Sequence, residues 1–150
     1  MQIGQGQNSA VTDRQARLIA NFSIHRMEKD EALILVETSL KDILLNHLES
    51  YHFREEVEFT ALNCRLLALQ GPKSSLILEK VFENQKLPDK PNDTSQVILG
   101  EHLINLIIKS LTGEEGQILC FPNELEDELT QLILKSDSPP IKVNEVAREV

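Results

Sequence analysis

The chain has 150 residues, of which 41% are hydrophobic and 26% charged, and it carries a formal net charge of −9. These proportions are typical of globular proteins, so they exclude disorder over the whole chain and fit a single domain. The negative charge, with Lys and Arg dispersed, argues against a nucleic-acid partner, because binding phosphates requires a basic face. No uninterrupted apolar run of about twenty residues is present, so the sequence predicts no membrane span.

The cellular compartment is predicted from the first residues and the cysteines. Residues 1–11 lack both the basic and the apolar region of a secretory signal, and we expect them to form a flexible N-terminal tail. Cys64 and Cys120 are the only cysteines, and both lie in apolar surroundings. They are interpreted as free buried thiols of a reducing compartment, which favours a cytoplasmic protein.

The first elements in chain order are predicted as helices. Thr12 and Gln15 have the spacing of a capping box, which indicates a helix start. Residues 18–24 alternate between apolar and polar as a strand would, yet the capping box favours helix, and the choice stays open. A second helix is expected over residues 31–50, because its leucines and isoleucines share one face and acidic residues precede it.

The middle of the chain is divided by glycine and proline. Residues 53–69 are expected to form a helix that ends at Gly71 and Pro72. Residues 76–82 fit a short helix or a strand, and periodicity does not decide between them. Residues 85–95 contain two prolines and several turn formers, which indicates a connection that could serve as a hinge.

Residues 97–111, VILGEHLINLIIKSL, are the most apolar stretch, with nine Val, Ile or Leu among fifteen residues. Drawn as a helix, they give an apolar arc about 200° wide, about twice what a surface helix needs. We therefore expect a core helix in which Leu103 and Ile107 are buried. Its edge, formed by Ile98, Leu99 and Leu106, is left for a partner.

The C-terminal part suggests a strand, a helix and a strand. The short apolar run at 117–121 ends at Pro122, residues 123–135 have strong helix-capping and charge signals, and residues 141–146 resemble a strand. The predicted fold class is mainly α, a multi-helix domain, with α+β as the alternative if this short unit forms. The predicted organisation is a globular domain over residues 12–146, with a hinge at 85–95, followed by a flexible tail at 147–150.

Candidate catalytic and metal-binding groups are few. Glu49 and His52 have the spacing of metal ligands on a helix, but the sequence offers no matching second pair. Cys64 has no neighbouring base in sequence, and neither a nucleophile elbow nor a phosphate-binding loop is present. We therefore predict no enzyme activity, no cofactor and no metal.

The function predicted from these observations is protein binding. A small acidic interaction module is expected, such as an adaptor, an assembly factor or a secretion-type chaperone, which binds a protein partner or itself as a homodimer. Its candidate partner-binding residues are Ile98, Leu99, Leu106, Glu37 and His47, the last two being polar groups on the apolar face of helix 31–50. The alternatives are a regulatory or inhibitor subunit that uses its acidic surface, and an enzyme or metal-binding domain whose site assembles only in the tertiary structure.

Overall fold

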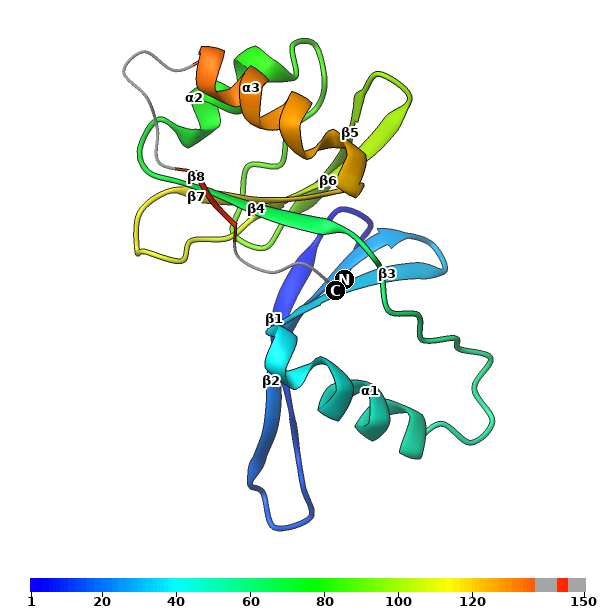
Figure 1. Cartoon of the computed structure of the whole chain (residues 1–150). Helices are drawn as coiled ribbons and strands as arrows, with labels where there is room; N and C mark the ends of the chain where they lie inside the picture. Colours follow the sequence, from blue (N-terminus) through cyan, green and yellow to red (C-terminus); the bar gives the residue numbers. More distant parts are fainter. Residues whose placement is uncertain (137–142, 146–150) are drawn as a thin grey trace.

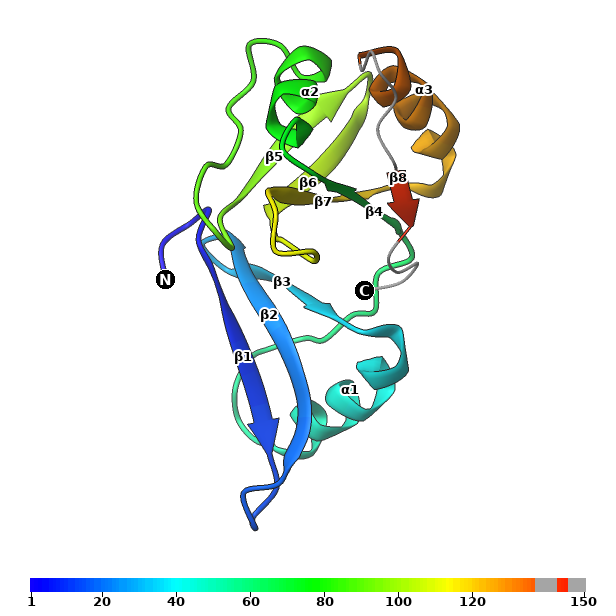
Figure 2. The ribbon, with the colours of Figure 1, turned by 90° about the vertical axis from the view of Figure 1, so that its left-hand side faces the viewer.

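The protein is mainly β, and the prediction of a mainly helical fold is wrong. A computed structural model describes residues 1–136 and 143–145, the last three by their backbone alone. The strands of this part form two antiparallel sheets, with the orders β1-β2-β3 and β5-β6-β7-β4-β8. In Figures 1 and 2 the second sheet lies between the smaller sheet on one side and helices α2 and α3 on the other.

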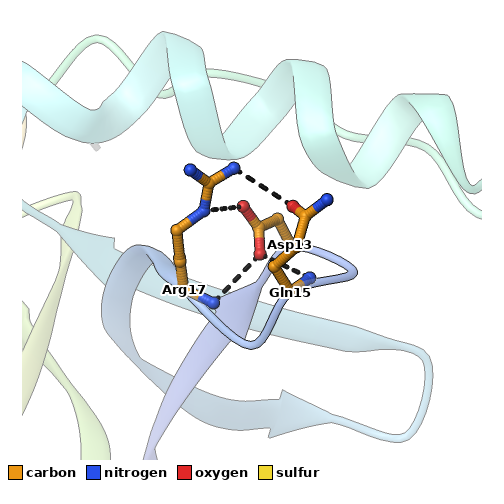
Figure 3. Close-up of polar contacts among 3 residues, drawn as sticks. All are labelled: Asp13, Gln15 and Arg17. Carbon is orange, nitrogen blue, oxygen red and sulfur yellow. Dashed lines mark hydrogen bonds and ion pairs between the residues drawn. The ribbon is translucent and has the colours of Figure 1, made fainter.

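The smaller sheet is built from β1 (Gly6–Thr12), β2 (Leu18–Glu28) and β3 (Glu31–Val36). The alternation in residues 18–24 therefore indicates a strand. The apparent capping box at Thr12 lies at a hairpin turn, where Asp13 Oδ1 accepts hydrogen bonds from the backbone N–H groups of Gln15 and Arg17 (Figure 3). Arg17 Nε donates to the other carboxylate oxygen at 2.7 Å, so the aspartate organises the turn.

The predicted helix over residues 31–50 is half strand and half helix. After β3, a 3₁₀ turn (Thr38–Leu40) leads into α1 (Lys41–Ser50). In β3, Leu33 and Leu35 face the second sheet, whereas Ile34 and Val36 pack toward α1. A strand with apolar residues on both faces has a continuous apolar run, and such a run also fits the apolar face of a helix.

The second sheet contains a β-α-β-β-α-β arrangement with one additional strand. Its elements are β4 (Arg65–Gln70), α2 (Ser74–Val81), β5 (Thr94–Leu99), β6 (His102–Ile108), β7 (Gly116–Phe121), a 3₁₀ turn (Asn123–Leu125), α3 (Glu126–Ser136) and β8 (Val143–Glu145). β4 lies between β7 and β8 and is antiparallel to both. The C-terminal strand, helix and strand thus exist, but their two strands are separated by β4 rather than paired.

The predicted helix over residues 97–111 is the hairpin of β5 and β6. Gly100, with a φ of +62°, forms the turn, and Val97 pairs with Ile104. The apolar arc is wide because β6 has apolar residues on both of its faces. Drawn as a helix, these two faces merge into one broad apolar surface. Leu106 is 0% exposed and Leu103 is 54% exposed, which is the opposite of the predicted assignment.

Two other boundaries differ from the prediction. Residues 53–69, predicted as a helix, form no helix, and only their last part has regular secondary structure, as strand β4. Gly71 and Pro72 do end an element, but that element is a strand, and α2 begins shortly after them. The undecided residues 76–82 belong mostly to this helix.

Three groups of buried apolar side chains hold the layers together. The largest lies between the second sheet and helices α2 and α3, and includes Phe82, Leu119 and Leu129. A second group lies between the two sheets and joins Leu33 and Leu35 to residues of β4, β6 and β7. A third lies between the smaller sheet and α1. Burial on both faces explains why the central strands carry few polar residues.

The predicted tail at 1–11 contains all of β1 except its last residue, and β1 is paired with β2 along its length. In the predicted hinge, the side chain of Gln85 bonds the edge strand β5: Ile98 N donates to Gln85 Oε1 at 2.7 Å, and Gln85 Nε2 donates to Ile98 O at 2.9 Å. The predicted tail at 147–150 lies outside the described residues. Within residues 1–136 and 143–145, no helix is long and apolar enough to cross a membrane.

Candidate functional site

A pocket of about 550 Å³ lies where the two sheets meet, and it is the best candidate site. Its apolar wall is formed by side chains from both sheets, among them Leu35, Leu66 and Ile118. Polar groups surround the rest of it, and these are Asn8, Ser9, Asn21, Glu37, Thr38, Ser39 and Lys109. An apolar pocket with a few convergent polar groups is the usual form of a small-molecule site.

A second pocket of about 320 Å³ lies between β3, α1 and residues 58–62. Most of its lining is hydrocarbon, from residues such as Ile34, Leu44 and Leu45. Both pockets carry acidic and basic side chains, but the smaller one belongs to one sheet and its helix, whereas the larger pocket collects groups from both sheets. The larger pocket, called the inter-sheet pocket below, therefore offers more chemistry.

A chain of hydrogen bonds lies behind one wall of the inter-sheet pocket. Lys109 Nζ is 3.1 Å from Ser23 Oγ, which is 2.9 Å from His25 Nε2. His25 Nδ1 is 2.9 Å from the carbonyl oxygen of Asn92. Since a carbonyl only accepts, Nδ1 carries a hydrogen, and Nε2 of the neutral ring then accepts from the Ser23 hydroxyl. Ser23 Oγ in turn accepts from the Lys109 ammonium.

Burial affects the protonation of the titratable groups in this hydrogen-bonded chain, Lys109 and His25. Ser23 and His25 are both 0% exposed. Burial lowers the pKa of His25 below its usual 6.5, although the bond to Asn92 opposes the shift, and the Lys109 charge lowers it further. Burial also lowers the pKa of Lys109 from its usual 10.5. His25 is therefore neutral near pH 7, which agrees with the donor and acceptor directions given by the geometry.

The chain matches no family model. It is 24% identical to an aminomethyltransferase of Thermus thermophilus over 142 residues, which is 93% of this chain and 41% of that protein. It is 25% identical to an aminomethyltransferase of Chlorobium limicola over 138 residues, which is 89% of this chain and 38% of that protein. The chain thus spans about two fifths of the length of the curated relatives it matches.

The fold has a counterpart among solved structures. The glycine cleavage system aminomethyltransferase T of Bartonella henselae superposes with a TM-score of 0.78 at 20% sequence identity, over 89% of this chain and 36% of that one. The fold is that of an aminomethyltransferase domain. The prediction of an adaptor or chaperone is therefore wrong, and so is the prediction that the chain is not an enzyme, because the relatives point to one.

The predicted partner-binding residues lie at different places in this fold. Glu37 is exposed and lines the inter-sheet pocket. His47 lies on α1 with its ring 4.9 Å from that of Tyr51. Ile98 is 56% exposed on the edge strand β5, Leu99 packs against the core beneath α2 and α3, and Leu106 is buried inside that core. The structure does not bring them together into one surface, and binding of a partner stays a prediction.

The other candidate groups are structural. His52 Nε2 contacts the backbone carbonyl oxygen of Glu55, and His52 N donates to the carbonyl oxygen of Glu49 at 3.2 Å. Within residues 1–136 and 143–145, no three metal-ligating side chains gather. Cys64 and Cys120 are buried thiols, as predicted, with their sulfur atoms 2.9 Å apart. The contact with Cys64, together with burial, raises the pKa of the Cys120 thiol, so it is a poor nucleophile at neutral pH.

Several site residues were missed because they are brought together only by folding. Asn21, Ser23 and His25 recur at every second position of β2, and this period-two signal is visible in the sequence LIANFSIHRM. Read as a strand, it would have placed three polar side chains on one face. Nothing in the sequence around Lys109 indicates that its side chain reaches Ser23, which lies 86 residues earlier.

Proposed function

We propose that this chain is a group-transfer unit of the aminomethyltransferase type, which binds its small-molecule substrate in the inter-sheet pocket. The observation that carries the proposal is the agreement of two comparisons over about nine tenths of the chain. One is with curated aminomethyltransferase sequences, and the other is with an aminomethyltransferase structure. The pocket supports it, because it lies where elements from both sheets of this shared fold converge.

The lining of the pocket suits the transfer of a group that contains an amine. A primary aliphatic amine is cationic near pH 7, and carboxylate and amide oxygens are suitable acceptors for an ammonium group. Glu37 supplies a carboxylate, and Asn8 and Asn21 supply amide oxygens. The apolar wall would limit the water that reaches the reacting atoms, and the polar groups would orient them.

We further propose that the protein works in the cytoplasm. The support is that Cys64 and Cys120 are thiols rather than a disulfide, although their sulfur atoms lie 2.9 Å apart. Such a pair is most easily kept reduced in a reducing compartment.

A reconstituted glycine cleavage mixture that lacks only its aminomethyltransferase tests the transfer function. We expect the full chain to accelerate the consumption of ¹³C-labelled glycine, followed by NMR, above that of the mixture alone. In Glu37→Gln the rate should fall by about tenfold, because a charge-assisted hydrogen bond to the amine becomes a neutral one. The matched control is Glu28→Gln, which removes an exposed carboxylate at the end of β2.

A second arm separates binding from turnover. Excess chain is added to the same mixture together with the Thermus thermophilus aminomethyltransferase. If the chain binds the same small molecules without transferring the group, it should slow the reaction by competition. A folded chain that neither accelerates the first mixture nor slows the second would overturn the proposed function.

A further inference from the structure

The backbone that carries Lys109 is held firmly at the wall of the inter-sheet pocket. Gln70, at the end of β4, donates from Nε2 to the carbonyl oxygen of Lys109 at 3.1 Å and accepts from the N–H of Leu111 at 2.9 Å. Lys109 N also donates to the carbonyl oxygen of Gly116 at 3.0 Å. The lysine therefore leaves the sheet at a fixed point rather than from a loose loop.

Gly116 makes room for this clamp. Gly116 is paired with Gln70 in the sheet, and a Cβ built on the glycine would lie 2.1 Å from Gln70 Oε1. Any larger residue would push the amide away from the backbone groups that it binds. The glycine thus gives the Gln70 amide the space in which it binds the backbone of Lys109 and Leu111.

The ammonium of Lys109 is held from one side only. Among the described residues, Ser23 Oγ is its hydrogen-bond acceptor, at 3.1 Å, and an ammonium group can donate three hydrogen bonds. Ser23 is itself fixed by His25, and His25 by the backbone of Asn92. The lysine is oriented by buried groups and keeps donors for a further acceptor, while its side chain forms part of the pocket wall.

The charges around Lys109 leave a place for an anion. His25 faces it from β2 and is neutral when its pKa is lowered. Glu37 lines the pocket after β3, and it is exposed. The lining residues from β1, β4 and β7 carry no titratable group, and these are Asn8, Ser9, Leu66 and Ile118. A partly buried cation without a buried counter-ion is costly, and a bound anion would offset that cost.

We propose that Lys109 binds an anionic group, a carboxylate, of a ligand whose apolar body lies against the inter-sheet wall, and that Ser23 is the positioning residue for the lysine. The inference rests on the proposed function in taking this pocket as the ligand site, and it names the chemical class of the ligand. Leu35, Leu66 and Ile118 form the buried floor of the pocket, and the more exposed Phe22 and Leu111 supply apolar surface beside the charge. Lys109 supplies one charge-assisted hydrogen bond or more to the carboxylate.

Three probes of the same length test the inference: pentanoate, 1-pentanol and pentylammonium. Their dissociation constants are measured by NMR titration of the full chain at pH 7, following backbone amides around the pocket. We expect pentanoate to bind about tenfold more tightly than 1-pentanol, as one charged hydrogen bond would give. Pentylammonium binding most tightly would overturn the inference, because Glu37 would then dominate recognition.

Substitution of Lys109 tests whether this lysine causes the preference for pentanoate over 1-pentanol. In Lys109→Met the preference for pentanoate over 1-pentanol should disappear, and in Lys109→Arg it should be kept. The matched control is Lys90→Met, which removes an exposed lysine between α2 and β5 and should leave the preference unchanged. If Lys109→Met is poorly folded, Lys109→Gln replaces it in the comparison with Lys109→Arg. A folded variant without the lysine that still prefers pentanoate would contradict the inference.

The pH dependence tests the role of Ser23. The preference for pentanoate should be lost as the pH rises through the pKa of Lys109, which burial places below 10.5. In Ser23→Ala the ammonium loses an acceptor, so this loss should occur at a lower pH. A purely structural role for the serine would weaken all three probes alike and leave that pH unchanged, which would remove Ser23 from the proposal.

The binding assay needs no turnover, so the two proposals fail separately. Preference for pentanoate that depends on Lys109, combined with no effect in the glycine cleavage mixtures, would retain the inference and reject the transfer function. Transfer activity with no carboxylate preference would do the reverse.

Discussion

At the scale of single residues, His25 joins the two sheets. It is fully buried, donates to the carbonyl oxygen of Asn92 ahead of β5 and accepts from Ser23 within its own strand. A buried histidine that bonds through both nitrogens as a neutral ring resists protonation. Its pKa is lowered mainly by burial, while the bond to Asn92 opposes the shift. The protonation of this one side chain is therefore linked to folding.

Acidification should destabilise the protein through His25. Because the pKa is lowered in the folded state, the unfolded chain takes up the proton first. The contribution of His25 to the free energy of unfolding is complete at a pH above the histidine pKa of the unfolded chain, about 6.5. It is lost as the pH falls through that value toward the lower pKa of the folded state. We expect the melting temperature to drop between about pH 7.5 and pH 5.5, and the drop to be smaller in His25→Gln.

The control for this experiment is His102→Gln, which removes a histidine at the start of β6 and leaves the bond to Ser23 intact. An equal drop in wild type and His25→Gln, measured by thermal melts across this range, would show that His25 does not carry the pH dependence.

At the scale of elements, β6 shows how a strand can imitate a helix. Its residues are apolar on both faces, since one face lies under α2 and α3 and the other lies toward the smaller sheet. Leu106 belongs to the first face, with no exposed surface, and Ile107 to the second. Leu103, near the start of the strand, is 54% exposed. Ile104 and Leu106 are buried and Asn105 between them is half-buried, which is the period of two expected for a strand. A helix would have placed Ile104 and Leu106 on opposite sides.

A pair of leucine substitutions in β6 tests this assignment. Leu106→Ala should lower the free energy of unfolding by about 2–5 kcal/mol, since it removes buried methyl groups and leaves a cavity. Leu103→Ala is the matched control and should change it by less than about 0.5 kcal/mol. Urea denaturation measures both. Equal losses, or a larger loss at Leu103, would contradict the strand and favour the helical arrangement of this segment.

At the scale of the whole molecule, a few polar contacts and a shared core fix how the sheets meet. Gly4 O accepts from Thr94 N at 2.8 Å, which ties the N-terminal segment to β5. Gly6, in β1, lies so close to this junction that an added Cβ would be 2.2 Å from His25 Nδ1 and 2.5 Å from the carbonyl oxygen of Asn92. The inter-sheet pocket lies between the same two sheets, so its shape depends on their arrangement.

Gly6→Ala should disturb the junction between the sheets. The methyl group would separate His25 from Asn92, and we expect a loss of about 1–3 kcal/mol in the free energy of unfolding, as for an overpacked core. Amide NMR signals near Asn92 should shift although the substitution is in β1. Gln7→Ala, at the exposed neighbouring position, should cause neither effect. If both variants behave alike, close packing at Gly6 does not hold the sheets together.

The sequence by itself determined the local features of this protein. Gly71 and Pro72 mark the end of an element, the acidic residues after Pro122 begin α3, and the apolar surroundings of Cys64 and Cys120 predict buried thiols. These depend on neighbours in the chain, such as capping groups, backbone angles and side-chain polarity. The fold class did not follow from them, because strands buried on both faces lose the alternation that identifies a strand.

Only the tertiary structure decided which segments pair and where the site lies. β4 is placed between β7 and β8, whose registers join Leu67 to Leu119 and to Glu145. The pocket likewise collects residues from Asn8 to Ile118, and its lysine is oriented by a serine 86 residues away. Such contacts are set by how the sheets pack, and no local pattern records them. Periodicity describes the faces of one element, whereas a binding site needs the faces of several elements to meet.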